Sequence, residues 1–252
     1  MTLPSPCTFP HSRQFATGDD AGLAPFFGSL ARRARNLCWR VILPVALLGV
    51  LAAAVPASTA RAAPQTLDFD IAHGGYVVGH QRVTFRQDGD KLVVHSELKI
   101  EVKVLSFVAY RYQQTRDEVW RNDKLIALAS KADDDGTPHN INAAAASDGK
   151  LKVTSGKDSW TLPAESVPAS YWNVSMVTAK GPLVDSLTGK ILPQRVVKLG
   201  QETVRAGGRD VVATHYRLEA KRQRDVWYDA AGRWVKMRAV ARDGSIAEWV
   251  LK

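Results

Sequence analysis

Between Leu92 and Val104, apolar and polar side chains alternate along the chain. The residues at even-numbered positions are apolar except for Ser96, and those at odd-numbered positions are polar except for Val93. Successive side chains of a β-strand point to opposite faces, so this pattern predicts a long strand with one buried face and one face in water.

Turn motifs separate further segments of this kind, as expected for strands joined by hairpins. Asp-Gly and Gly-Gly pairs suit tight hairpin turns because glycine accepts positive φ freely. The motifs are Gly74-Gly75, Asp88-Gly89, Asn122-Asp123, Asp135-Gly136, Asp148-Gly149, Ser155-Gly156, Gly207-Gly208, Asp229 to Gly232, and Asp243-Gly244. Ten to twelve antiparallel strands are more than a flat sheet holds comfortably. The sequence therefore predicts an all-β fold, either a strongly curved sheet or an open or closed β-barrel.

One long segment breaks the alternation. Pro163 to Pro193 is rich in proline and contains no run with a period of two. We expect a long connection with one short helix around Tyr171 to Thr178, lying over the sheet or closing its mouth. Long ordered connections in compact domains are often functional.

Residues 1–62 have the features of a secretory signal peptide with a long N-terminal region. A basic cluster from Arg32 to Arg40 precedes an uncharged stretch from Val41 to Ala60, and Ala60-Arg61-Ala62 fits a cleavage site. The alternative is a transmembrane anchor, but prolines shorten the apolar stretch. We expect cleavage near Ala62, a periplasmic location without a stable membrane anchor, and a single antiparallel β domain over residues 63–252.

Charge and cysteine content exclude several classes of protein. Both cysteines, Cys7 and Cys38, precede the cleavage site, so the mature domain would have no disulfide or thiolate nucleophile. The net charge of +9 falls on removal of residues 1–62, because six arginines and two aspartates leave with them. The remaining excess of basic residues is too small to predict a nucleic-acid-binding protein.

No catalytic or metal-binding motif is present. His80 and His95 could meet across a hairpin as two metal ligands, and Asp133 to Gly136 resembles the start of a calcium loop without its later glutamate. We assign no catalytic residue, metal or cofactor. A triad assembled from distant residues stays open, because sequence alone does not reveal one.

Aromatic residues give the strongest indication of a binding site. Side chains of this kind lining a concavity suit an apolar or amphiphilic ligand, although many must belong to the core. The predicted ligand-binding residues are Tyr171, Trp172, Asn173, Tyr110, Tyr112 and Trp227. The segments Glu118 to Asn122 and Asp225 to Asp229 also look alike, which suggests either two related half-sheets or a common hairpin solution.

Ser170 to Asn173, Asp225 to Asp229, Gly75 with Gly79, and Asp243 to Ser245 together resemble a family of exported proteobacterial proteins known only as a domain of unknown function. The likeness covers Leu67 to Leu251. More distantly, the chain is similar to periplasmic half-barrels that carry lipoproteins. That resemblance implies a curved antiparallel sheet around an apolar cavity that helices close.

Three functions follow from these observations. The first is a non-enzymatic binding module for an apolar or amphiphilic molecule, such as a lipid, an acyl chain or a hydrophobic peptide. The second is a structural or assembly factor of the cell envelope, whose partner would be an envelope protein. The third is a hydrolase whose catalytic residues the sequence does not reveal.

Overall fold

The computed structural model describes residues 65–252 except 194, 221 and 242. The predicted signal peptide and its cleavage site lie outside the described residues. Almost all regular structure in the described part is β, with one helix, α1 (Ser175–Thr178). The strands are β1 (Gln65–His73), β2 (Tyr76–Asp88), β3 (Lys91–Val104), β4 (Phe107–Arg121), β5 (Lys124–Asp134), β6 (Thr137–Ala145), β7 (Leu151–Ser155), β8 (Asp158–Leu162), β9 (Val167–Pro168), β10 (Leu183–Val184), β11 (Arg195–Ala206), β12 (Arg209–Glu219), β13 (Arg224–Asp229), β14 (Trp234–Val240) and β15 (Ile246–Leu251).

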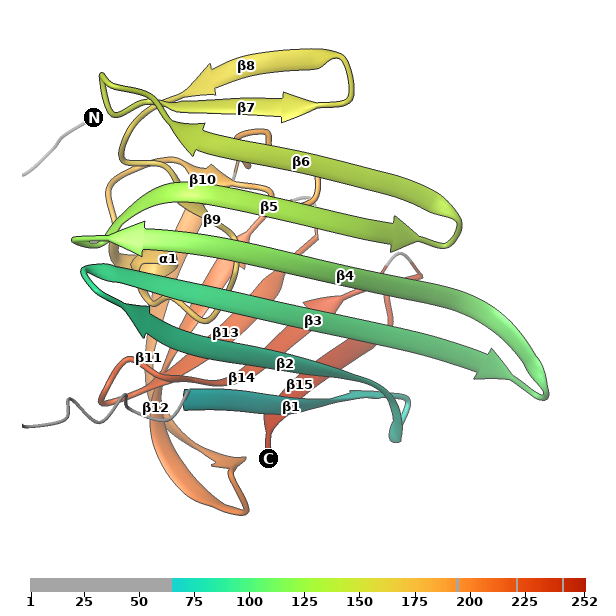
Figure 1. Cartoon of the computed structure of the whole chain (residues 1–252). Helices are drawn as coiled ribbons and strands as arrows, with labels where there is room; N and C mark the ends of the chain where they lie inside the picture. Colours follow the sequence, from blue (N-terminus) through green and yellow to red (C-terminus); the bar gives the residue numbers. More distant parts are fainter. Residues whose placement is uncertain (1–64, 194, 221, 242) are drawn as a thin grey trace, which may run out of the picture. The chain divides into compact units, whose positions relative to one another are not determined.

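Thirteen of these strands form one antiparallel sheet in the order β11-β12-β13-β14-β15-β1-β2-β3-β4-β5-β6-β7-β8. This confirms the predicted all-β class and exceeds the expected ten to twelve strands. The first and last strands of the described part pair in the middle, with Phe69 opposite Leu251. The sheet is not closed, because β11 and β8 are its two edges. Figure 1 shows β2 to β8 as one wall and β11 to β15 behind it.

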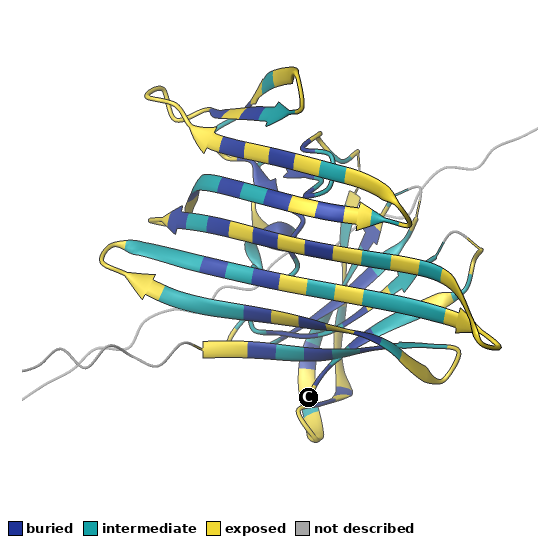
Figure 2. Cartoon of the chain, turned by 45° about the vertical axis from the view of Figure 1, so that its right-hand side comes forward, coloured by how far each residue is buried: buried dark blue, intermediate teal, exposed yellow. Residues whose placement is uncertain are grey.

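The alternation predicted for β3 is confirmed. Val94 and Ser96 are buried on the inner face, while Glu97 and Lys99 are exposed on the outer face. The same alternation runs across neighbouring strands, and Figure 2 shows it as buried and exposed bands. Register fixes lateral rows on the inner face, one of which runs Met237, Trp249, Ile71, Gly79, Ile100, Tyr112 and Asp134.

Gly79 allows a close approach between two strands of this row. A Cβ at Gly79 would lie 2.2 Å from the backbone oxygen of Lys99 and 2.9 Å from Cα of Ile100. A register shift lies beside it, between Ile71 and Ala72 of β1. Bulges and strand glycines bend a sheet, so this is one place where the sheet curves.

The segment 163–193 is the long connection that the sequence predicts. It contains α1 and the short parallel pair β9 and β10, which the sequence did not indicate. The helix is shorter than predicted and begins at Ser175. Tyr171 has a φ of 63°, outside the helical region, and Asn173 Oδ1 accepts the backbone N–H of Ser175 at 2.9 Å. These two residues end the preceding loop instead of starting the helix.

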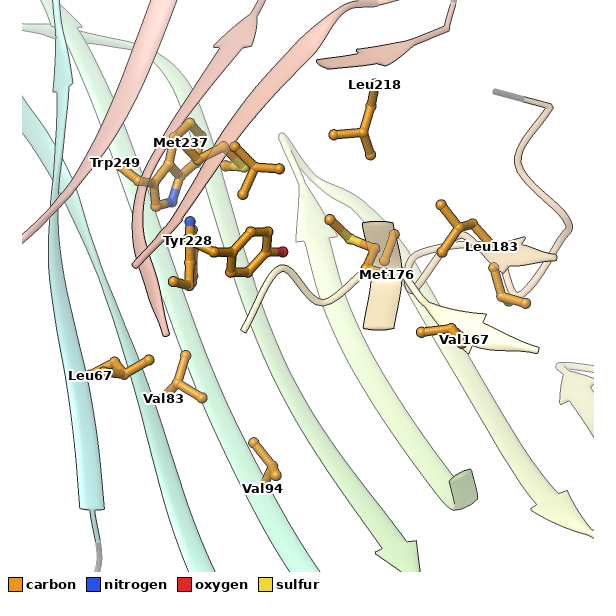
Figure 3. Packing of buried hydrophobic residues seen from close by; sticks show 14 of the residues in the cluster. Leu67, Val83, Val94, Val167, Met176, Leu183, Leu218, Tyr228, Met237 and Trp249 are labelled. Carbon is orange, nitrogen blue, oxygen red and sulfur yellow. The ribbon is translucent and has the colours of Figure 1, made fainter. Parts of the chain in front are cut away.

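The hydrophobic core lies between the two parts of the sheet and the connection. Figure 3 shows Leu67, Val83 and Val94 from β1 to β3 facing Tyr228, Met237 and Trp249 from the C-terminal strands. Met176, Val167 and Leu183 of the connection complete the cluster. The connection is therefore part of the core, because its buried side chains link the two walls.

Candidate functional site

Trp172 packs on the inner face of the N-terminal part of the sheet. Its ring centroid lies 5.3 Å from that of Phe85 and 5.7 Å from that of Trp120, both in edge-on geometry. Such aromatic pairs are favourable beyond their area of contact. Trp172 thus ties the connection to β2 and β4.

A buried ion pair lies beneath this tryptophan. Arg116 Nε is 2.8 Å from Glu118 Oε1, and the Glu118 side chain is 1% exposed. Glu118 Oε2 accepts the indole N–H of Trp120 at 2.8 Å and that of Trp172 at 3.1 Å. Both Nη groups of Arg116 donate to the connection, to Ser186 Oγ and to the carbonyl of Ser170. Removing one partner of a buried ion pair leaves the other charge buried without a counter-ion, which is strongly destabilising. The hydrogen bonds of this cluster therefore hold the connection in place.

The connection fills the hollow that the sequence suggested beneath it. The void left between the connection and β5 to β8 measures about 10 Å³ and is lined by apolar residues such as Leu128, Ile141 and Val184. That is about the space of one water molecule. A ligand of several carbon atoms does not fit in this void, so the void does not supply the apolar cavity expected beneath the connection.

The other two predicted binding residues of the connection also have structural partners. The Tyr228 hydroxyl donates to the Tyr171 carbonyl at 2.7 Å, and the Tyr171 ring lies 5.8 Å from that of Trp234. Asn173 accepts hydrogen bonds from the backbone and hydroxyl of Ser175. The contacts of Tyr171 join the connection to the C-terminal strands, whereas those of Asn173 stay within the connection. The predicted role of both residues in ligand binding stays a prediction.

Tyr110 and Tyr112 lie on the inner face of β4, farther along the strand from the buried ion pair. Tyr112 pairs with Ile100 and Asp134 in register, and burial raises its pKa well above the usual tyrosine value. The Tyr110 hydroxyl donates to Asp134 at 2.8 Å. Both tyrosines are half-buried, so this region of the inner face is less covered than the region near Trp172.

Trp227 lies on the opposite, outer face of the sheet. Its ring stacks on His215 with centroids 4.2 Å apart, and Lys236 Nζ lies 5.5 Å from its centroid. Its indole N–H donates to Glu202. Only 3% of the residue is exposed. Sequence reasoning grouped Trp227 with Trp172, but the structure separates them by the thickness of the sheet.

This difference also bears on the resemblance between the two Trp-containing segments. Trp120 and Glu118 point to the interior, whereas Trp227 and Asp225 point outward, since Val226 and Tyr228 occupy the inner face. A one-residue shift of register reverses the faces of a strand. The two segments therefore occupy different environments, which supports the common-hairpin interpretation.

A larger depression lies at the far end of β2 and β3. It measures about 970 Å³ and lies beside the turn between β1 and β2. We call it the hairpin groove. Its apolar lining includes Tyr76, Val78 and Ile100, and its charged lining includes Lys99, Lys103, Arg111 and Glu101. Ligand sites commonly have about 300–1,000 Å³, so this groove has the size for an organic molecule.

Positive charge predominates in the hairpin groove. Glu101 forms ion pairs with both Lys103 at 3.1 Å and Arg111 at 3.0 Å, and these hydrogen bonds hold the pKa of its carboxyl below the usual value. His80 pairs with Asp70 at 2.7 Å. Lys99 is exposed and forms no ion pair within the described part of the chain. An anionic group in the groove would meet an uncompensated ammonium.

The structure also tests the predicted pairing of two histidines as metal ligands. In the β2–β3 register His80 lies opposite Lys99 and His95 opposite Thr84, so the two histidines do not face one another. Within residues 65–252, no cluster of three or more His, Cys, Asp or Glu residues is arranged to hold a metal ion. Among the described helices, none has the length and apolar character needed to cross a membrane.

Comparison with known proteins places the chain in a family. The family described as Domain of unknown function (DUF6134) matches residues 69–252. A search of curated proteins found no match. A similar solved structure is titled "Crystal Structure of Beta-barrel-like Protein of Domain of Unknown Function DUF1849 from Brucella abortus", with a TM-score of 0.55 and 11% sequence identity over 75% of this chain and 95% of that one. At this identity the likeness concerns the fold alone.

Proposed function

This chain belongs to the family of the domain of unknown function DUF6134, and for it we propose a non-enzymatic binding role in the periplasm. The ligand is an amphiphile with an anionic headgroup and an acyl chain. It binds in the hairpin groove, not beneath the connection. The observation that carries this proposal is the combination of ligand-sized space, apolar lining and the unpaired Lys99 in one groove.

The chemistry of the lining supports an amphiphile over a fully polar or fully apolar ligand. Val77 and Val78 supply aliphatic surface, and Tyr76 adds an amphipathic ring. Lys99 and Arg111 supply donors for a phosphate or carboxylate. Glu101 offsets part of the charge of Lys103 and Arg111, so Lys99 is the cation that remains to pair with the ligand.

Binding of dodecyl phosphate below its micelle concentration tests the proposal, with calorimetry as the measurement. We expect one molecule to bind per chain, and affinity to rise roughly three- to fourfold per added methylene between octyl and dodecyl phosphate, as burial of CH₂ groups requires. Dodecanol, which lacks the anion, should bind more weakly.

Two matched lysine variants locate the site. Lys99→Ala should weaken dodecyl phosphate binding roughly fivefold, the effect of losing one charge-assisted contact of about 1 kcal/mol. Lys131→Ala is the control, because Lys131 is exposed on the same outer face and does not line the groove. Equal loss in both variants, or no saturable binding, would contradict the proposal and favour the assembly-factor hypothesis.

A further inference from the structure

A row of polar side chains crosses the outer face of the sheet within the hairpin groove. The register pairs His80 of β2 with Lys99 of β3, and Lys99 with Gln113 of β4. Figure 1 shows these three strands side by side. Directly opposite residues of antiparallel strands share a face and have Cβ atoms about 5 Å apart. His80, Lys99 and Gln113 are all exposed and all line the groove, so we call them the polar row.

A carboxylate lies at each end of the polar row. Asp70 of β1 is opposite the histidine, and Asp133 of β5 is opposite the glutamine. Asp70 also forms an ion pair with Lys252 at 2.8 Å. Asp133 lies two strand spacings, about 10 Å, from Lys99 along the row. The row carries no excess of positive charge, so it can recognise a ligand only through individual hydrogen bonds.

The pairing of His80 with Asp70 assigns the tautomer of the imidazole. His80 Nδ1 lies 2.7 Å from Asp70 Oδ1, and because a carboxylate accepts a hydrogen bond at this distance, Nδ1 carries the proton. The other ring nitrogen, Nε2, forms no hydrogen bond to any residue that the structure describes. In the neutral imidazole, Nε2 therefore offers the groove a hydrogen-bond acceptor.

The hydrogen-bonding groups of the polar row specify the headgroup that matches it. Lys99 and the amide of Gln113 donate to anionic oxygens, whereas His80 Nε2 needs an O–H donor. A phosphomonoester supplies both near neutral pH, because its second pKa is about 6 and its monoanion keeps one P–O–H group. Carboxylates, sulfate esters and phosphodiesters carry no proton at this pH, so they leave Nε2 without a partner.

We propose that the polar row recognises a phosphomonoester headgroup. The P–O–H group donates to His80 Nε2, and the anionic oxygens accept hydrogen bonds from Lys99 and Gln113. This inference rests on the proposed binding of an anionic amphiphile in the hairpin groove and specifies the headgroup of that amphiphile. His80 is the residue that distinguishes a phosphomonoester from the other anions.

Three ligands with the same alkyl chain test the headgroup by calorimetry near neutral pH. They are dodecyl phosphate, dodecyl sulfate and methyl dodecyl phosphate, each below its micelle concentration. The sulfate and the methyl ester are anions without an O–H group. We expect dodecyl phosphate to bind roughly tenfold more tightly than the other two, the effect of one hydrogen bond that involves a charged group.

Two matched histidine variants assign the preference to the polar row. His80→Ala should weaken dodecyl phosphate binding to the level of dodecyl sulfate and leave dodecyl sulfate binding nearly unchanged. Asp70 keeps its ion pair with Lys252 in this variant, so the variant should fold. His95→Ala is the control, because His95 Nδ1 also lies 2.7 Å from a carboxylate oxygen, that of Asp117, but does not line the groove. It should keep the tenfold preference.

The outcomes separate this inference from the proposed ligand function. Saturable binding with equal affinity for the three ligands would overturn the phosphomonoester inference and leave the binding role in place. A preference that survives in His80→Ala would do the same, because it would come from the second negative charge of the phosphate and not from the histidine. Absence of saturable binding for all three ligands would overturn both proposals.

Discussion

The two ends of the inner face of β4 differ in what covers them. Near Glu118 and Trp120 the connection packs onto the strand, and the remaining void is about 10 Å³. Near Phe107 the strand projects into solvent beside a depression of about 970 Å³. One strand therefore contributes both to a filled interior and to an exposed surface.

The same comparison applies to the two bulky residues with positive φ. Tyr171 has a φ of 63°, and its carbonyl and ring are held by Tyr228 and Trp234. Leu105 has a φ of 56° and is almost fully exposed. Surrounding structure stabilises an unfavourable backbone only where it makes contacts. Tyr171 is thus explained by folding, whereas the described part of the chain shows no contact that offsets the backbone strain at Leu105.

The largest expected effect concerns the buried ion pair at the filled end. Glu118→Leu leaves the Arg116 charge and two indole N–H groups without their acceptor, so unfolding free energy should fall by about 3–5 kcal/mol. Urea denaturation measures the change. The double variant Arg116→Met with Glu118→Leu should recover much of the loss, and a single variant as stable as the double one would show that the pair does not fix the connection.

Trp172→Ala should destabilise the protein next most strongly. It removes the edge-on contacts with Phe85 and Trp120 and one hydrogen bond to Glu118, and we expect a loss of about 3 kcal/mol in urea denaturation. Dodecyl phosphate binding by the folded variant should be unchanged, because the groove lies at the other end. Loss of that binding in a folded variant would place the ligand site back at the connection.

Gly79→Ala should have an intermediate effect on stability and a direct effect on the groove. The new methyl group meets the Lys99 carbonyl, so the two strands must separate, at a cost of about 2 kcal/mol. Gly79 and Lys99 both line the groove, so ligand binding should weaken as well. Gly89→Ala is a useful control, because it places a Cβ on a residue with a φ of 60° where nothing lies within 4 Å. Its loss of stability measures backbone strain without a steric clash.

Leu105→Asn should give the smallest change, and in the opposite direction. Asparagine tolerates the left-handed conformation better, so the variant should be more stable by about 1 kcal/mol in thermal or urea denaturation. A destabilised variant would mean that Leu105 makes contacts that support the fold. The contrast between the two ends would then lose its basis.

Much of the fold could be predicted from the sequence, while much of the site could not. Alternation in residues 92–104 and the Gly- and Asp-containing turns predicted antiparallel strands, because both features are local. The position of Trp227 was not predictable in this way. Its face depends on the register of β12 to β14 and on the shift between Trp227 and Tyr228. The hairpin groove was missed too, although the apolar run Val104-Leu105 across a turn is a visible indication.

The sequence by itself determined which residues form strands, where the chain turns and which alternate side chains of a strand face the core. These features follow from backbone preference and side-chain polarity. Only the tertiary structure decided what occupies the interior. Residues 163–193 fill the space between the walls because Glu118 and Arg116, more than 50 residues away from Trp172 and Ser170, supply the charges that hold them. Such pairings depend on distances in space that no local pattern encodes.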